Sequence, residues 1–191
     1  MDLAGFFRLI EKLKRAAAWQ ERAGIRSEIV STAKAFKSEL GGLLLGEKDP
    51  DFQIELLNII GATHDDYFVP ALRQILSTSS LSEVLQTAAT NLGKLGNGGF
   101  ETLVGLLQHH DPNVRLGAIY GLAASGDTRA IPHLANLLDD PSEARVWWPG
   151  PKAGGYLIRR EASSTIDTLA GERLAGDRQR IARWLEQHPT D

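Results

Sequence analysis

The chain has 191 residues with 42% hydrophobic and 24% charged side chains, a formal net charge of −3 at pH 7, and no cysteine. This balance is typical of a globular protein with a continuous core, and the lack of cysteine excludes disulfides, thiolate zinc sites and cysteine nucleophiles. No apolar run approaches the roughly 18 residues of a membrane-spanning helix, and acidic Asp2 stands where a secretory signal would be basic. We therefore expect a cytoplasmic protein that does not enter a membrane.

The first 48 residues predict two capping helices, over 2–22 and 26–45. Apolar residues recur at helical spacing in the first helix, while Arg8 and Lys12 lie on other faces. A basic amphipathic helix can lie on a membrane, but the first cap of a helical array has the same pattern, and we favour the cap. The second helix is expected to end or kink at Gly41–Gly42.

A regular helical array is predicted to begin at Asp49–Pro50, and residues 111–140 form its clearest unit. Asp and Pro at 111 and 112 are typical of a helix start, an apolar stripe follows, and Gly126–Asp127 ends that helix and caps the next. Two short amphipathic helices of this kind cannot bury their apolar faces alone, so the unit needs neighbours. The pattern predicts helices near 50–62, 66–77, 81–95, 99–109, 112–124 and 128–139.

Three apolar columns repeat through this array at one spacing. Leu72, Leu103 and Leu134 are separated by 31 residues in each step, and two further columns keep the same step. A fourth copy follows an insertion of roughly fourteen residues, because 158–166 matches 114–122 at a separation of 44. A last helix, expected over 172–187, has the polar outer face of a terminal cap.

These residues resemble the HEAT repeat family, and more closely its short bacterial variety found in phycobilin-lyase-like proteins. The full pattern is present at Asp111, Pro112, Val114, Arg115, Ala118, Leu122, Gly126, Asp127, Ile131, Pro132 and Leu134. The resemblance covers about 49–187 and implies an all-α fold, a right-handed α-solenoid of about five HEAT-like helical hairpins. With the length of the chain it predicts one domain over 1–191, made of capping helices (1–48), three regular repeats (49–140), and a fourth repeat with a loop insertion and a C-terminal cap (141–191).

The acidic residues of the array have two explanations. Residues 49–140 hold 4 Lys or Arg against 11 Asp or Glu, which could attract a basic partner. We favour helix capping, because five of these acids stand at expected helix starts. They are Asp49, Asp65, Asp111, Asp127 and Asp139.

The resemblance implies that the second helix of each repeat lines a concave face. Residues beside the leucine columns then form a small, polar ladder without a row of Lys or Arg. Since duplex DNA binding needs several phosphate neutralisations, we expect no nucleic-acid groove there. The candidate partner-binding residues of the ladder are Gln74, Thr102, His133 and Asn136.

The insertion 142–156 is the strongest candidate for a binding loop. It contains Trp147 and Trp148 among prolines and glycines, which argues against a helix. Long loops often carry function, and Trp and Arg dominate many binding interfaces. Either tryptophan could instead fold back over the groove between the third and fourth repeats. The candidate residues of the loop and its flank are Arg145, Trp147, Trp148, Lys152, Tyr156 and Arg159.

Catalytic and metal patterns are weak. His109 and His110 are adjacent at an expected helix end and are expected to point in different directions, and Asp65–Asp66 is better explained as a cap than as a catalytic pair. No phosphate-binding loop or serine nucleophile motif is present. We therefore expect no cofactor and no metal.

The preferred function is a non-enzymatic protein–protein interaction module, such as an adaptor, assembly factor or inhibitor, that binds through its concave face and the 142–156 loop. The resemblance to phycobilin-lyase-like repeats suggests an alternative, a chromophore-binding enzyme in which Trp147, Trp148, Tyr120 and Tyr156 stack on a tetrapyrrole. A third alternative, similarity to HEAT-like DNA glycosylases, would require a basic concave face that the sequence does not predict.

Overall fold

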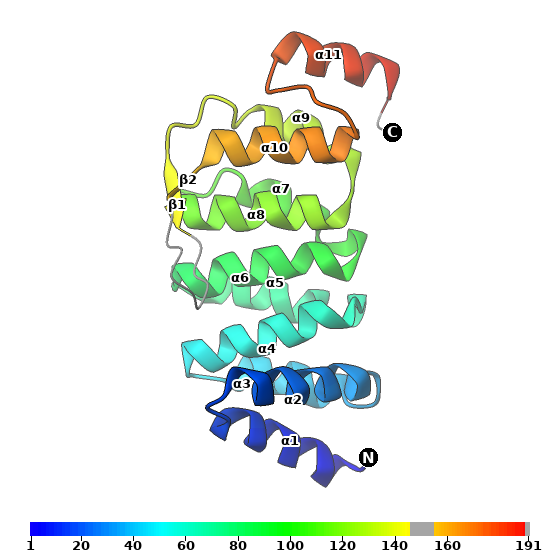
Figure 1. Ribbon diagram of the computed structural model, residues 1–191, viewed down its shortest axis with the longest axis vertical. Coiled ribbons are helices and arrows are strands. Elements are labelled where there is room, and N and C mark those ends of the chain that lie inside the picture. Colours follow the sequence, from blue (N-terminus) through cyan, green and yellow to red (C-terminus); the bar gives the residue numbers. More distant parts are fainter. Residues whose placement is uncertain (146–154, 190–191) are drawn as a thin grey trace.

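The computed structural model describes residues 1–145 and 155–189, which form eleven α-helices and one two-stranded sheet (Figure 1). Helix α1 (Leu3–Arg15) stands at one end, and the other α-helices follow in five sequential pairs. The pairs are α2 (Trp19–Thr32) and α3 (Lys37–Gly46), α4 (Pro50–Thr63) and α5 (Val69–Thr78), α6 (Ser82–Leu92) and α7 (Phe100–Leu106), α8 (Pro112–Ser125) and α9 (Ile131–Ala135), and α10 (Ile158–Ala170) and α11 (Arg178–Gln187). Short 3₁₀ helices are η1 (Ala33–Ala35), η2 (Asp66–Phe68), η3 (Gly93–Leu95), η4 (Asn97–Gly99) and η5 (Thr128–Ala130).

The pairs stack into two layers, which confirms the predicted α-solenoid of helical hairpins. The first helices of the pairs (α2, α4, α6, α8 and α10) pack on one another, and the second helices α3, α5, α7 and α9 lie behind them in Figure 1. The second helices contact mainly the first helices rather than each other. In the part of the chain that the structure describes, no helix is long and apolar enough to cross a membrane.

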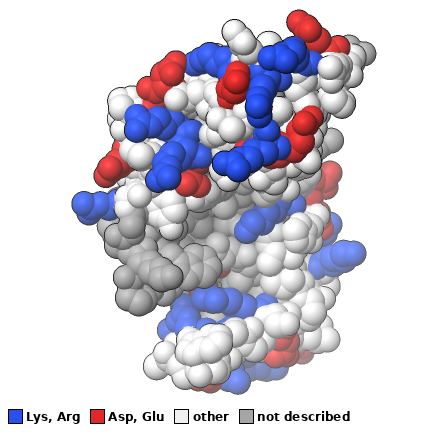
Figure 2. Space-filling view, turned by 45° about the horizontal axis from the view of Figure 1, so that its top comes forward, with Lys and Arg blue, Asp and Glu red and all other residues white. Residues whose placement is uncertain are grey.

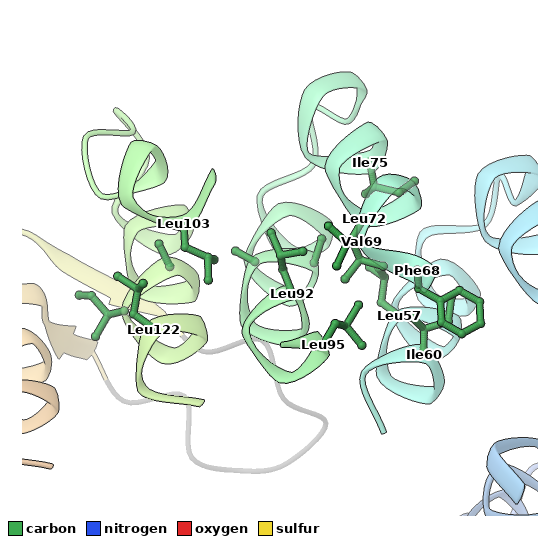
Figure 3. Packing of buried hydrophobic residues seen from close by; sticks show 14 of the residues in the cluster. Leu57, Ile60, Phe68, Val69, Leu72, Ile75, Leu92, Leu95, Leu103 and Leu122 are labelled. Carbon is green, nitrogen blue, oxygen red and sulfur yellow. The ribbon is translucent and has the colours of Figure 1, made fainter. Parts of the chain in front are cut away.

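The core lies between the two layers, where the predicted leucine columns meet the stripes of the first helices (Figure 3). Leu72, Leu103 and Leu134 are all buried, as are Leu92 and Leu122 opposite them. All five belong to one continuous apolar cluster that runs from α1 to α11. The columns therefore form one shared seam, because no single hairpin could bury its apolar face alone.

Aspartate caps fix the helix starts, as predicted for four of the five expected positions. Asp49, Asp65, Asp111 and Asp127 each accept a hydrogen bond from the main-chain N–H two residues later. Asp139 was predicted wrongly, since its carboxylate pairs with Arg178 at 2.6 Å instead. The acids of the array are therefore mostly committed to the turns between helices.

The N-terminal and C-terminal helices differ from expectation. The predicted helix over 2–22 is broken after Arg15, and Arg22 Nη1 donates to the carbonyl oxygen of Ala16 at 3.2 Å. The second helix breaks at 33–36, whereas Gly41–Gly42 lies inside α3. The last helix begins at Arg178 rather than 172, because Asp177 caps it. Gly171 and Gly176, both with left-handed backbone, and the Asp177 cap are therefore the local signals that place the last helix later than expected.

The insertion emerges from the array as a β-hairpin that the sequence did not predict. Strands β1 (Glu143–Arg145) and β2 (Gly155–Leu157) pair antiparallel, with Ala144 opposite Tyr156. Both strands lie beyond residue 140, so the regular array is helical throughout. The connecting residues 146–154, with Trp147, Trp148 and Lys152, lie outside the described residues.

Candidate partner-binding surface

Two glycines bring the first helices unusually close together. A Cβ on Gly117 of α8 would lie 2.6 Å from the carbonyl oxygen of Gln86 of α6, and one on Gly93 would lie 1.8 Å from the carbonyl oxygen of Gly121. The second helices have no comparable packing between neighbours. Close approach on one layer alone would bend an array toward that layer. We therefore take the first helices, rather than the second helices that the resemblance implied, as the candidate inner side.

We call the side of this layer that faces away from the second helices the first-helix face. Ala124 is exposed on it, and the other residues that define it are half-buried or buried: Glu55, Asn58, Gln86, Thr90, Asn91, Lys94 of η3, Gly117, Tyr120 and Glu161. Figure 2 shows a hollow on this side of the molecule. Polar side chains are recessed here, since all the buried polar residues of the described chain (Glu55, Gln86, Asn91 and Thr165) belong to first helices.

A network of side-chain hydrogen bonds, formed by two amides and one ammonium group, connects α6 to α4. Asn91, fully buried, donates from Nδ2 to Asn58 Oδ1 and to the carbonyl oxygen of Thr87, each at 3.0 Å. Lys94 Nζ donates to Asn91 Oδ1 at 2.9 Å. Burial lowers the pKa of Lys94 below its ordinary value. This network fixes the direction of the Asn91 amide, because its oxygen and nitrogen are both engaged.

One turn earlier on α4, a buried carboxylate is held by two guanidinium groups. Arg26 binds both oxygens of Glu55, and Arg22 Nη2 lies 3.6 Å from Oε2. The hydrogen bond to Glu55 raises the pKa of Arg26. Arg22, which donates to the carbonyl oxygen of Ala16 at the end of α1, thus also links α2 to α4 and ties the N-terminal cap to the array.

At the other end of the face, Tyr120 of α8 donates to Glu161 of α10 at 3.1 Å. Burial first, and then the neighbouring Glu161 carboxylate, raises the pKa of this phenol far above its ordinary value. Tyr120 therefore stays protonated and acts as a hydrogen-bond donor between repeats. Tyr120 is half-buried.

The hairpin is attached to this same face. Arg145 donates its main-chain N–H to Asn113 Oδ1 at 2.6 Å, and its carbonyl oxygen accepts from Gln86 Nε2 at 3.0 Å. The side chain of Arg145 is exposed, as is Arg159 at the start of α10, whereas Tyr156 packs half-buried against the core. The structure therefore brings Arg145 and the first-helix face together.

The predicted ladder lies on the other layer. Gln74 and Asn136 are exposed on α5 and at the end of α9, and His133 is half-buried with its ring 6.2 Å from that of Phe100. Thr102 accepts a hydrogen bond from Arg73 at 3.0 Å. Because these residues belong to second helices, the structure does not combine them with the hairpin into one surface. Their part in binding stays a prediction.

The weak catalytic patterns have structural roles. His109 Nδ1 accepts from the main-chain N–H of Asp111 at 3.1 Å, which completes the turn before α8. Asp65 pairs with Lys37 at 2.5 Å, and this hydrogen bond holds the pKa of Asp65 below its ordinary value. Among the residues described, no group of three or more His, Asp or Glu is placed to hold a metal ion.

Sequence reasoning missed Asn58, Asn91 and Lys94. The sequence contains a pattern that could have identified them, because these polar residues follow the apolar stripes of α4 and α6 at helical spacing. Which of the polar residues beside the stripe are buried depends on the distance between neighbouring helices. That distance is set by the packing of the whole array.

Comparison with known proteins supports the repeat architecture. No curated protein matches the chain. The family described as HEAT repeats matches residues 69–148, the stretch from α5 through β1 and into the insertion.

Proposed function

We propose that this protein is a non-enzymatic interaction module that binds a partner protein on the first-helix face, with the 142–156 loop at the border of the contact. HEAT repeats are generally scaffolds for protein interaction, and stacked hairpins present a large, stiff, curved surface. In this role Arg145, Tyr156 and Arg159 would contact the partner from the hairpin side, together with Trp147, Trp148 and Lys152.

The observation that carries the proposal is the recessed polar face with the hairpin tied across its edge. Arg145 is held by side chains of two different first helices, so strand β1 is fixed against the first-helix face. Recessed hydrogen-bonding groups on a rigid support favour specific contacts, because the groups need little reordering on binding.

Site-specific photo-crosslinking tests which face is used. A photoreactive phenylalanine replaces Ala124, which is exposed on the first-helix face, or Gln74, which is exposed on the second-helix layer. We expect a protein identified by mass spectrometry to cross-link at position 124 and to bind the purified chain. Cross-linking at position 74 alone would favour the predicted ladder of Gln74, Thr102, His133 and Asn136 instead.

The chromophore-binding alternative stays an untested prediction. It would use Tyr120, whose hydroxyl is engaged by Glu161, and Tyr156, whose ring packs against the core. A bilin added to the purified protein would show a shifted absorption spectrum if this alternative holds. An absorption shift without any cross-linked protein would replace the interaction module by a pigment-binding function.

A further inference from the structure

Three positively charged side chains converge on one turn of α4. Glu55 and Asn58 are three residues apart, so they are neighbours on the same side of that helix. Arg22 and Arg26 reach Glu55 from α2, and Lys94 is linked to Asn58 through the Asn91 amide. One carboxylate therefore pairs with two guanidinium groups, and Lys94 adds a third positive charge on the same face without a carboxylate of its own.

Lys94 is the cation among these without an opposite charge. Among the described residues no carboxylate lies within ion-pair distance of its ammonium group, and its hydrogen-bond partner is a neutral amide. Lys14 and Lys37, by comparison, each pair with an acid at 2.9 and 2.5 Å. Lys94 is half-buried, so water solvates its charge incompletely. A carboxylate from outside would supply the missing charge, since the ammonium group has three protons and one of them is engaged by Asn91.

Resting on the proposed function, we propose that the first-helix face binds a segment of its partner rich in Asp and Glu, and that Lys94 receives one of its carboxylates. Arg22 and Arg26 contribute the positive field beside it. Figure 2 shows Lys and Arg side chains above and below the hollow, although the chain as a whole carries a net charge of −3. Four of the acids of the array, Asp49, Asp65, Asp111 and Asp127, are engaged as caps at the turns.

An acidic protein segment fits this face better than a nucleic acid. A nucleic-acid groove requires a row of cations that follows the phosphates, with several of them neutralised at once. The face has a compact cluster instead, and the carboxylates of Glu55 and Glu161 lie on the same layer. Spaced carboxylates on a peptide can bind Lys94 and avoid these acids, whereas a continuous phosphate backbone would run against them.

The test is an NMR titration of the full chain with hexaglutamate at low salt. The side-chain amide of Asn91 is the local reporter, since its oxygen accepts the Lys94 hydrogen bond. We expect saturable shifts of this signal and of the Lys94 amide. Lys94→Gln keeps a donor for Asn91 and removes the charge, so the dissociation constant should rise about tenfold. Lys94→Arg should stay within about threefold of the wild type.

Lys48→Gln is the matched control, because Lys48 is exposed, and it should change the dissociation constant less than about twofold. Equal binding by the wild type and Lys94→Gln, with unchanged circular dichroism, would overturn the proposal. Tighter binding of an oligothymidylate than of hexaglutamate at the same salt would also overturn it, in favour of nucleic acid. Either result leaves cross-linking at position 124 as the separate test of the interaction module.

Discussion

Gly117 of α8 lies directly against the main chain of Gln86 of α6, where an added Cβ would approach the carbonyl oxygen to 2.6 Å. The obstacle is backbone, which cannot rotate away as a side chain could. Gly117→Ala should therefore force α6 and α8 apart and lower the free energy of unfolding by about 1–3 kcal/mol. Urea denaturation followed by circular dichroism measures this loss.

Gly105→Ala is the matched control for this substitution. Gly105 lies within α7, is exposed, and has open space at its Cβ position. Alanine there should stabilise the helix by about 0.5–1 kcal/mol, because it restricts the unfolded chain without a clash. If both variants had the same free energy of unfolding, the close approach of α6 and α8 would not depend on a glycine at position 117, and the first helices would not form the tighter layer.

Arg115 connects three segments of the third regular repeat. Its guanidinium donates to Asp140 at 2.9 Å and to the carbonyl oxygens of His109 and His110 at 2.6 and 3.1 Å. Arg115→Met should lower the free energy of unfolding by about 2–4 kcal/mol, since the carbonyls and a largely buried carboxylate lose their donor. Arg183→Met, at an exposed position, should change it by less than about 0.5 kcal/mol in the same urea experiment.

Acid should destabilise the fold through carboxylates at the turns. Burial raises the pKa of Asp111, but hydrogen bonds from Ser82 and Asn113 outweigh it and leave the pKa lowered. The same balance, with Ser142 and Arg115 as partners, lowers the pKa of Asp140. A carboxylate whose pKa is lowered in the folded protein stabilises the fold at pH values above its ordinary pKa of about 3.9. This stability is lost as the pH falls through the lower pKa of the folded protein.

Urea midpoints measured between pH 3 and pH 7 would therefore be level near neutrality and fall below about pH 4. Asp111→Asn should flatten this fall, because it removes one of the titrating groups. An unchanged slope in that variant would show that the Ser82 and Asn113 contacts do not favour the ionised carboxylate.

The repeat could be predicted from the sequence because local signals agree with tertiary packing. Asp49 and Asp111 cap helices, and Leu72, Leu103 and Leu134 lie in the core, because the same short pattern recurs in each copy. The break after Arg15, by contrast, is joined by a contact from Arg22 of the next helix. Sequence patterns that describe one helix at a time do not contain that contact.

The candidate surface was less predictable for a related reason. The insertion at 142–156 interrupts the pattern and could be recognised, whereas the side on which it folds could not. That side is set by Asn113 and Gln86, which belong to different repeats and lie 27 residues apart. The importance of Lys94 likewise depends on the absence of a nearby carboxylate, which only the assembled helices of the described chain reveal.

The hairpin should loosen when Asn113 loses its acceptor. Asn113 Oδ1 receives the main-chain N–H of Arg145, and its Nδ2 donates to Ser82 at 3.1 Å, so one side chain links the loop to α6 and α8. In Asn113→Ala the Arg145 amide should exchange with solvent about tenfold faster, measured by hydrogen exchange, while core amides of α8 keep their rates. Asn113→Asp retains an oxygen acceptor and should preserve most of the protection. Partner binding should weaken in Asn113→Ala and not in Asn113→Asp, because only the alanine variant loses the acceptor for the Arg145 N–H. Equal exchange rates of the Arg145 amide in both variants would mean that strand pairing alone positions the hairpin.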